Sequence, residues 1–189
     1  MKLKISISII TAILFLSGCS TSIISSGKTN QFKNPASSLN IVFLQKKFTF
    51  KHVNLFSTSD AENANTDQND LALKITKIMP KVFSENGIPS SAKISKSNKL
   101  RNIRSLFPSS KKSSFLVLKV IDASKTCGGG CFRFKIQASL INSLTGNVTY
   151  QSIVLLPPKA TRFSDFSGVV EDFSKSLHEL MKKDKIIKN

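Results

Sequence analysis

The stretch "FRFKIQASLINSLTGNVTYQSIVLL", residues 132–156, decides the fold. Apolar and polar side chains alternate along its first half, with Phe132, Phe134 and Ile136 on one parity and arginine, lysine and glutamine on the other. This alternation predicts a strand with one buried face and one solvated face, which is typical of antiparallel sheets. Gly146 can take the positive φ that a tight turn needs, so we expect the second half to return beside the first as a hairpin.

The segments around this hairpin extend it into a layered α+β domain. Residues 39–45, 92–95 and 113–126 predict three further strands, because each is short and rich in apolar residues. Two long amphipathic helices are expected, one over residues 71–87 and one from Ser164 to Met181, together with a short helix within residues 96–108. The predicted fold is therefore a mixed β-sheet with two long helices and one short helix, in the order βαβαβββα.

Two details of the long helices are also predicted. The polar segment 57–70 is expected to be a loop in which Asp67 and Asp70 cap the first helix. A calcium loop is the alternative, but the acids lack the spacing of an EF-hand. His178 lies one position off the apolar stripe of the second helix, so we expect it to be exposed.

The first residues have the layout of a bacterial export signal. Two lysines precede a mostly apolar stretch over residues 5–15, which is too short to span a bilayer. Residues 16–19, "LSGC", resemble the lipobox of bacterial lipoproteins, which implies that residues 1–18 are a signal peptide and that Cys19 is lipidated. Ser20 stands where inner-membrane retention signals usually have aspartate, so the resemblance implies the outer membrane, facing the periplasm. The alternative is an ordinary signal peptide with a chance cysteine.

The rest of the chain is expected to be a single domain joined to the membrane by a lipidated tether. Residues 19–38 are small and polar with little periodicity, which predicts a lipidated flexible tether, and residues 39–189 then form a single periplasmic domain. The chain has 28 basic and 11 acidic residues, a net charge of +17. Such an excess favours an anionic partner such as phospholipid head groups, glycan or nucleic acid, or it reflects only solubility and a lysine-rich composition.

Cys127 and Cys131 flank three glycines in "SKTCGGGCFRF". Two thiols this close in an exported chain predict a disulfide that closes a hairpin turn. A metal site is the alternative, but two thiolates need further ligands, and the chain has only His52 and His178 to offer. A redox-active pair usually has two intervening residues beside a helix start. We therefore expect no metal and no cofactor, and His52 is expected to be partly buried.

A run of basic residues without an acid lies between Glu85 and Asp122. It predicts a contact surface for an anionic partner, either a membrane surface or an acidic protein face, made of Lys93, Lys96, Lys99, Arg101, Arg104, Lys111 and Lys112. The alternative is an ordinary solvated face. Aromatic residues do not alternate with these cations, which argues against single-stranded nucleic acid, so no nucleic-acid partner is expected.

The order of elements, together with "ASLINSLTGNVTYQS" in the last hairpin, resembles a group of envelope proteins that share the fold of the TolB amino-terminal domain. The group includes lipoprotein activators of peptidoglycan synthases, PelC and CsgG. Its hairpin often reads L-D-x-x-T-G-x-V-x-W, which Thr145, Gly146 and Val148 match, whereas Asn142 replaces the acid and Tyr150 the tryptophan. The resemblance implies a protein that works by docking or oligomerising, without shared catalytic residues.

These features predict a non-enzymatic outer-membrane lipoprotein whose periplasmic domain binds or supports another envelope component, such as a synthase or an export or secretion machine. Its expected partners are the membrane, through the lipid, and an envelope protein or an anionic surface, with homo-oligomers left open. One alternative is a ring-forming structural subunit of a secretion complex. Another is an envelope hydrolase, but the sequence contains no paired carboxylates, Ser-His-Asp arrangement, metal cluster or phosphate loop, and no catalytic residue is expected.

Overall fold

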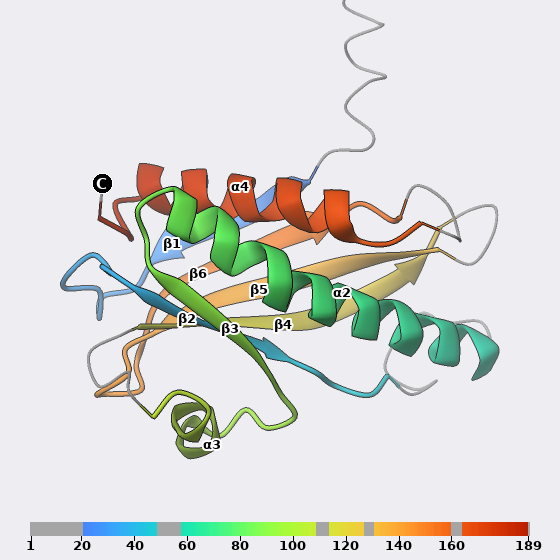
Figure 1. Cartoon of the computed structure of the whole chain (residues 1–189), viewed down its shortest axis with the longest axis horizontal. Helices are drawn as coiled ribbons and strands as arrows, with labels where there is room; N and C mark the ends of the chain where they lie inside the picture. Colours follow the sequence, from blue (N-terminus) through green and yellow to red (C-terminus); the bar gives the residue numbers. More distant parts are fainter. Residues whose placement is uncertain (1–20, 49–57, 109–113, 127–130, 160–163, 189) are drawn as a thin grey trace, which may run out of the picture.

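The computed structural model describes residues 21–48, 58–108, 114–126, 131–159 and 164–188. Its elements follow the expected α+β order, with one additional strand at the start (Figure 1). The strands are β1 (Ser22–Lys28), β2 (Leu39–Leu44), β3 (Ser90–Ser95), β4 (Ser114–Lys125), β5 (Phe132–Ile141) and β6 (Val148–Leu156). The helices are α2 (Thr58–Glu85), α3 (Leu100–Ser105) and α4 (Ser167–Lys183).

The strands form one mixed sheet in the order β1-β6-β5-β4-β2-β3. β4, β5 and β6 pair antiparallel, as the alternation along residues 132–156 predicts, and β1 pairs antiparallel with β6. β2 runs parallel to both of its neighbours, β3 and β4. The predicted mixed sheet with two long helices and one short helix is confirmed.

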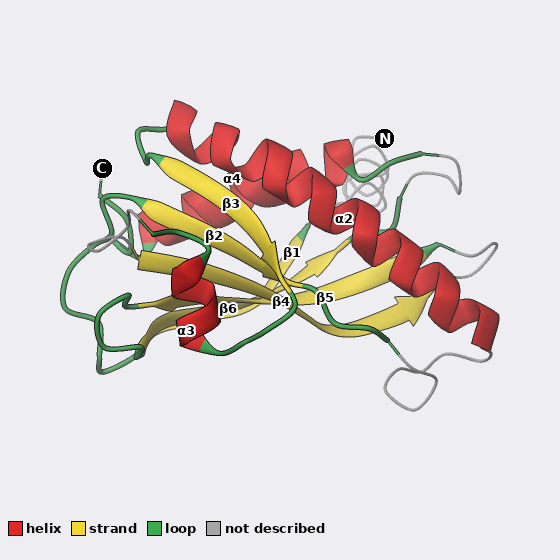
Figure 2. Ribbon diagram, turned by 60° about the horizontal axis from the view of Figure 1, so that its bottom comes forward, coloured by secondary structure: helices red, strands yellow, loops and turns green. Residues whose placement is uncertain are grey.

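The two long helices cover one face of the sheet, and α3 covers part of the other face (Figures 1 and 2). Ile41 and Phe43 of β2 belong to the core beneath α2 and α4. Val42, between them, packs in a second cluster with Ile103 of α3. β2 is therefore buried on both faces, which explains its unbroken apolar sequence "LNIVFL".

The hairpin between β5 and β6 turns as predicted. Gly146 has a φ of 77°, in the left-handed region that favours glycine. A Cβ atom at this position would lie 2.8 Å from Cδ2 of Leu100, at the start of α3. The positive φ is therefore the main reason for a glycine here, since the end of the Leu100 side chain could shift to admit a Cβ atom.

The segment predicted to be a flexible tether contributes the edge strand β1, so that prediction is wrong for residues 22–28. β1 pairs with β6 from Ser22 opposite Leu155 to Lys28 opposite Tyr150. All side chains of β1 are exposed, so the sequence has no buried alternation that would reveal the strand. β1 forms because its backbone pairs with that of β6, and this long-range contact cannot be predicted from the local sequence.

The first long helix begins at Thr58, well before the predicted start at Leu71, so the prediction of a loop is wrong for residues 58–70. Asp67 lies inside α2 and pairs with Lys159 at 2.6 Å, instead of capping the helix. Asp70 accepts a hydrogen bond of 3.2 Å from the backbone N–H of Phe166, just before α4. Contacts with distant segments therefore stabilise a polar stretch that reads as a loop when it is taken alone.

His178 is buried, so the expectation of an exposed histidine is also wrong. Its side chain is 5% exposed, and its ring meets Phe83 of α2 edge to face with centroids 5.4 Å apart. α2 packs along the side of α4 and covers this position next to the apolar stripe.

Candidate binding crevice beyond strands β2 and β3

The chain leaves β2 and β3 toward opposite faces of the sheet. From β2 it passes through α2 on one face and returns as β3, and from β3 it passes through α3 on the other face into β4 (Figure 2). Because β2 and β3 are parallel neighbours, their carboxyl ends at Leu44 and Ser95 lie side by side. Neighbouring parallel strands that send their connections to opposite faces leave a crevice at this point, which is a common location of ligand sites in open α/β sheets.

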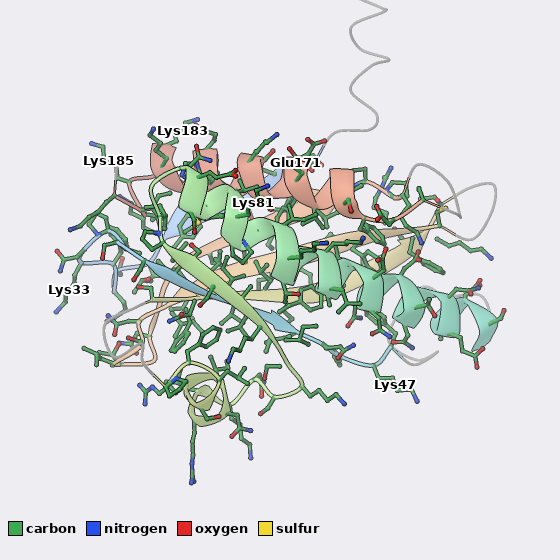
Figure 3. The ribbon with its side chains drawn as sticks, viewed as in Figure 1. Lys33, Lys47, Lys81, Glu171, Lys183 and Lys185 are labelled. Atoms are coloured by element: carbon green, nitrogen blue, oxygen red, sulfur yellow. The ribbon has the colours of Figure 1, made fainter. Side chains whose placement is uncertain are left out.

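A cavity of about 750 Å³ occupies this position, within the size range of ligand-binding sites. Its walls come from the segment after β2, the first half of α2 and the residue after β3. The lining residues are Gln45, Lys46, Lys47, Glu62, Asn65, Thr66, Asn69 and Lys96. Figure 3 shows Lys47 projecting outward from the segment after β2, below the first half of α2.

Side-chain amides of α2 hold the segment after β2 in place. Asn65 accepts a hydrogen bond of 2.8 Å from the backbone N–H of Phe48 and donates one of 3.1 Å to the Phe48 carbonyl. Oε1 of Gln68 accepts a hydrogen bond of 3.0 Å from the backbone N–H of Lys46. This helix face therefore binds a stretch of polypeptide backbone that is not part of any helix or strand.

Two side-chain amides in the wall of the crevice, those of Gln45 and Asn69, bind each other through only one of their two polar groups each. Nε2 of Gln45 donates a hydrogen bond to Oδ1 of Asn69. Within the described part of the chain, Oε1 of Gln45 and Nδ2 of Asn69 have no further hydrogen bond. The crevice thus presents one acceptor and one donor on adjacent side chains.

The charge of the crevice is positive, because three lysines face one glutamate in its lining. The other acids in the first half of α2 are engaged elsewhere. Asp67 pairs with Lys159 at 2.6 Å, with side chains 9% and 11% exposed, and Asp60 pairs with Lys125 at 2.8 Å. These inward ion pairs neutralise the acids of α2 that could otherwise balance the lysines of the crevice.

The structure divides the predicted basic contact surface into two kinds of residue. Lys93 donates a hydrogen bond of 2.7 Å to the Leu106 carbonyl and lies over the ring of Phe107, 5.5 Å from its centre. Arg104 donates to the carbonyls of Ser143 and Leu144 in the turn between β5 and β6. Both of these cations hold α3 and its surroundings together.

The remaining described cations of that surface are exposed. Lys96 lines the crevice, and Lys99 and Arg101 lie at the start of α3. Lys111 and Lys112 lie outside the described residues. All five described cations of the predicted surface are exposed, but only Lys96, Lys99 and Arg101 are not engaged in holding α3 in place. Lys46 and Lys47, which lie outside the predicted run, continue this surface into the crevice.

Two titratable groups away from the crevice have shifted pKa values. The hydrogen bond from Lys74, at 2.6 Å, lowers the pKa of Asp165 to about 2 and ties the segment before α4 to α2. Burial raises the pKa of Tyr150 to about 12, with the nearby charge of Asp184 adding to the shift.

The other predicted sites are only partly within the described residues. Cys19, Cys127 and His52 lie outside them, whereas Cys131 is half-buried and forms no disulfide with another described residue, so the disulfide between Cys127 and Cys131 stays a prediction. The described residues contain no group of three or more His, Cys, Asp or Glu side chains that could hold a metal ion. None of the helices in the described ranges is long and apolar enough to cross a membrane.

No family model and no curated protein matches this sequence. Among solved structures, the PelC dodecamer from Paraburkholderia phytofirmans is similar at 12% identity with a TM-score of 0.45, covering 89% of this chain and 99% of that chain. A lipoprotein from Neisseria meningitidis is similar at 9% identity with a TM-score of 0.32, covering 77% of this chain and 99% of that chain. A putative neuraminyllactose-binding hemagglutinin homolog from Helicobacter pylori is similar at 9% identity with a TM-score of 0.31, covering 84% and 90%. These likenesses are distant, and none of them assigns a role to a residue of the crevice.

Proposed function

We propose that this chain is a lipid-anchored protein of the bacterial envelope that works by binding another envelope component and not by catalysis. The observation that carries the proposal is the position of Cys19 in the sequence, at the end of the predicted export signal and three residues before the first strand at Ser22. An extended chain spans at most about 3.3–3.6 Å per residue, so a lipid on Cys19 would hold the start of β1 within about 10 Å of the membrane surface. A lipid on Cys19 would therefore hold the folded domain close to the membrane surface.

The sheet order sets which surface such an anchor would leave free. β1 is one edge of the sheet and β3 is the other, five inter-strand steps away. At about 4.8 Å per step, the strands that border the crevice lie about 20–24 Å from the anchored edge. The cationic crevice would therefore be presented to a partner on the far side of the body.

Substitution of the lipid site tests the proposal. Cys19→Ser should leave an uncleaved or soluble protein that no longer fractionates with the outer membrane, because several acyl chains provide the attachment. Cys131→Ser is the matched control and should fractionate like the wild type. Recovery of fully processed Cys19→Ser protein in the outer membrane would overturn the proposal.

A ring-forming structural subunit is the second candidate, and the exposed edge of β1 favours it. Ile23 and Ile24 are 43% and 53% exposed on an edge strand, and such edges pair readily with other chains. Sedimentation velocity of the purified chain should then show an assembly that Ile24→Lys dissociates. A monomer at all protein concentrations would exclude this candidate.

A further inference from the structure

We infer that the crevice beyond β2 and β3 binds an extended acidic segment of a partner protein. The inference deepens the proposed function and rests on it for the location of the partner. Three properties of the crevice carry it: the sign of its charge, the hydrogen-bonding groups of its wall and its distance from the predicted anchor.

The charge of the crevice selects an anionic ligand. Lys46, Lys47 and Lys96 reach the cavity from two different loops, and Glu62 is the one acid among the described lining residues. The cavity is concave, so a ligand inside it contacts several of these cations at once. Clefts lined by charge of one sign also raise the local concentration of oppositely charged ligands.

The hydrogen-bonding groups of the wall suit a polypeptide backbone. Asn65 already binds both the N–H and the C=O of Phe48, so this face of α2 demonstrably accommodates peptide groups. Next to it, Oε1 of Gln45 and Nδ2 of Asn69 offer one acceptor and one donor, which is the complement of a single peptide group. None of the described lining residues is aromatic, so stacking platforms for nucleic-acid bases are absent from this part of the site.

The position of the crevice argues against a membrane surface as its ligand. The crevice borders β2 and β3, and β3 is the sheet edge opposite β1, which follows the predicted lipid site. In an arrangement in which the sheet extends away from the membrane at its β1 edge, the separation of about 20–24 Å exceeds the Debye length of about 8 Å at physiological salt, and the lysines of the crevice would sense anionic head groups only weakly. A segment of a protein that extends away from the membrane can reach the crevice directly.

Binding of a synthetic peptide tests the inference. The probe is a short fluorescent peptide of alternating glutamate and serine, and the full-length chain in a non-ionic detergent is titrated against it by fluorescence anisotropy. A matched peptide of glutamine and serine reports the contribution of charge. We expect the acidic peptide to bind, the neutral peptide to bind at least about tenfold more weakly, and the affinity to fall as salt is raised.

Charge reversal locates the site. The triple variant Lys46→Glu, Lys47→Glu and Lys96→Glu should bind the acidic peptide at least about tenfold more weakly, because three exposed charge contacts become repulsive. The control variant Lys33→Glu, Lys183→Glu and Lys185→Glu makes the same charge change at the opposite end of the molecule from Lys47 (Figure 3) and should change affinity less than about threefold. Glu62→Gln should act in the other direction and tighten binding about twofold.

Two results would overturn the inference. Equal losses in both triple variants would show that overall charge, and not the crevice, attracts the peptide. Binding of polygalacturonate or of phosphatidylglycerol vesicles through the crevice lysines, with no binding of the peptide, would assign the site to an acidic glycan or a lipid surface instead. Neither result depends on Cys19, so failure here is distinguishable from failure of the proposed lipid anchor.

Discussion

Substitution of Lys159 by methionine is expected to lower the free energy of unfolding by about 3 kcal/mol. Lys159 and Asp67 form an ion pair of 2.6 Å, with side chains only 11% and 9% exposed. Among the described residues, Oδ2 of Asp67 has no hydrogen bond, so Lys159 is the group that compensates this carboxylate. Removing one partner of a buried pair costs about 3–5 kcal/mol, and the residual exposure of both side chains favours the lower end.

Urea unfolding followed by far-ultraviolet circular dichroism measures this loss. The midpoint should fall while the m-value stays constant, since the surface exposed on unfolding is unchanged. Lys81→Met is the matched control on α2, because its pair with Glu85 is 3.9 Å long and its side chain is 75% exposed, and it should cost about 0.5 kcal/mol or less (Figure 3). Equal costs for the two variants would show that the pair does not fix the first half of α2, and the crevice would then lack a rigid wall.

Three further predictions address the α3 surface, the α4 start and the cysteine turn. Arg104→Ala should lower the free energy of unfolding by about 1–2 kcal/mol, through lost charge-assisted hydrogen bonds to the β5–β6 turn, whereas Arg101→Ala should stay within about 0.5 kcal/mol; equal effects in urea unfolding would refute this division. Asp165 has a pKa lowered from 3.8 to about 2 in the folded state, so its stabilising contribution is present above pH 3.8 and is lost as the pH falls through about 2. Asp165→Asn should therefore melt at a lower temperature than the wild type at pH 7 and at the same temperature near pH 2, and a difference that does not vary with pH would contradict the assignment. Cys127 and Cys131 should resist alkylation in freshly isolated native protein, and full labelling without reductant would favour a reduced pair.

The sheet could be predicted from the sequence because its signals are local. The alternation along β5 reflects one buried face of the strand. The turn before β6 contains a residue with positive φ, and a glycine in the sequence indicates such a position. β2 is buried on both faces and therefore appears as a short, unbroken apolar run.

The first half of α2 could not be predicted because its stabilising contacts are long-range. Asp60 and Asp67 pair with Lys125 and Lys159, which lie far along the chain. In the sequence alone, an acid ahead of an apolar stripe has the usual features of a helix cap. β1 was missed for a related reason, since its exposed side chains make no pattern and its order comes from pairing with β6.

Only some of the residues that line the crevice could be predicted from the sequence. The basic run contained Lys96, but it also contained Lys93 and Arg104, which the fold uses to hold α3. Lys46 and Lys47 join Lys96 only through the parallel pairing of β2 with β3. Which residues lie close together across a sheet depends on the order of its strands. The run of basic residues in the sequence therefore could not reveal that Lys46 and Lys47 belong to the crevice, or that Lys93 and Arg104 do not.

Mass spectrometry of the mature protein isolated from membranes tests the central claim most directly. Residues 1–18 should be absent, and the amino-terminal peptide should begin at Cys19 and carry acyl chains. An amino terminus at Met1, or an unmodified Cys19, would contradict it.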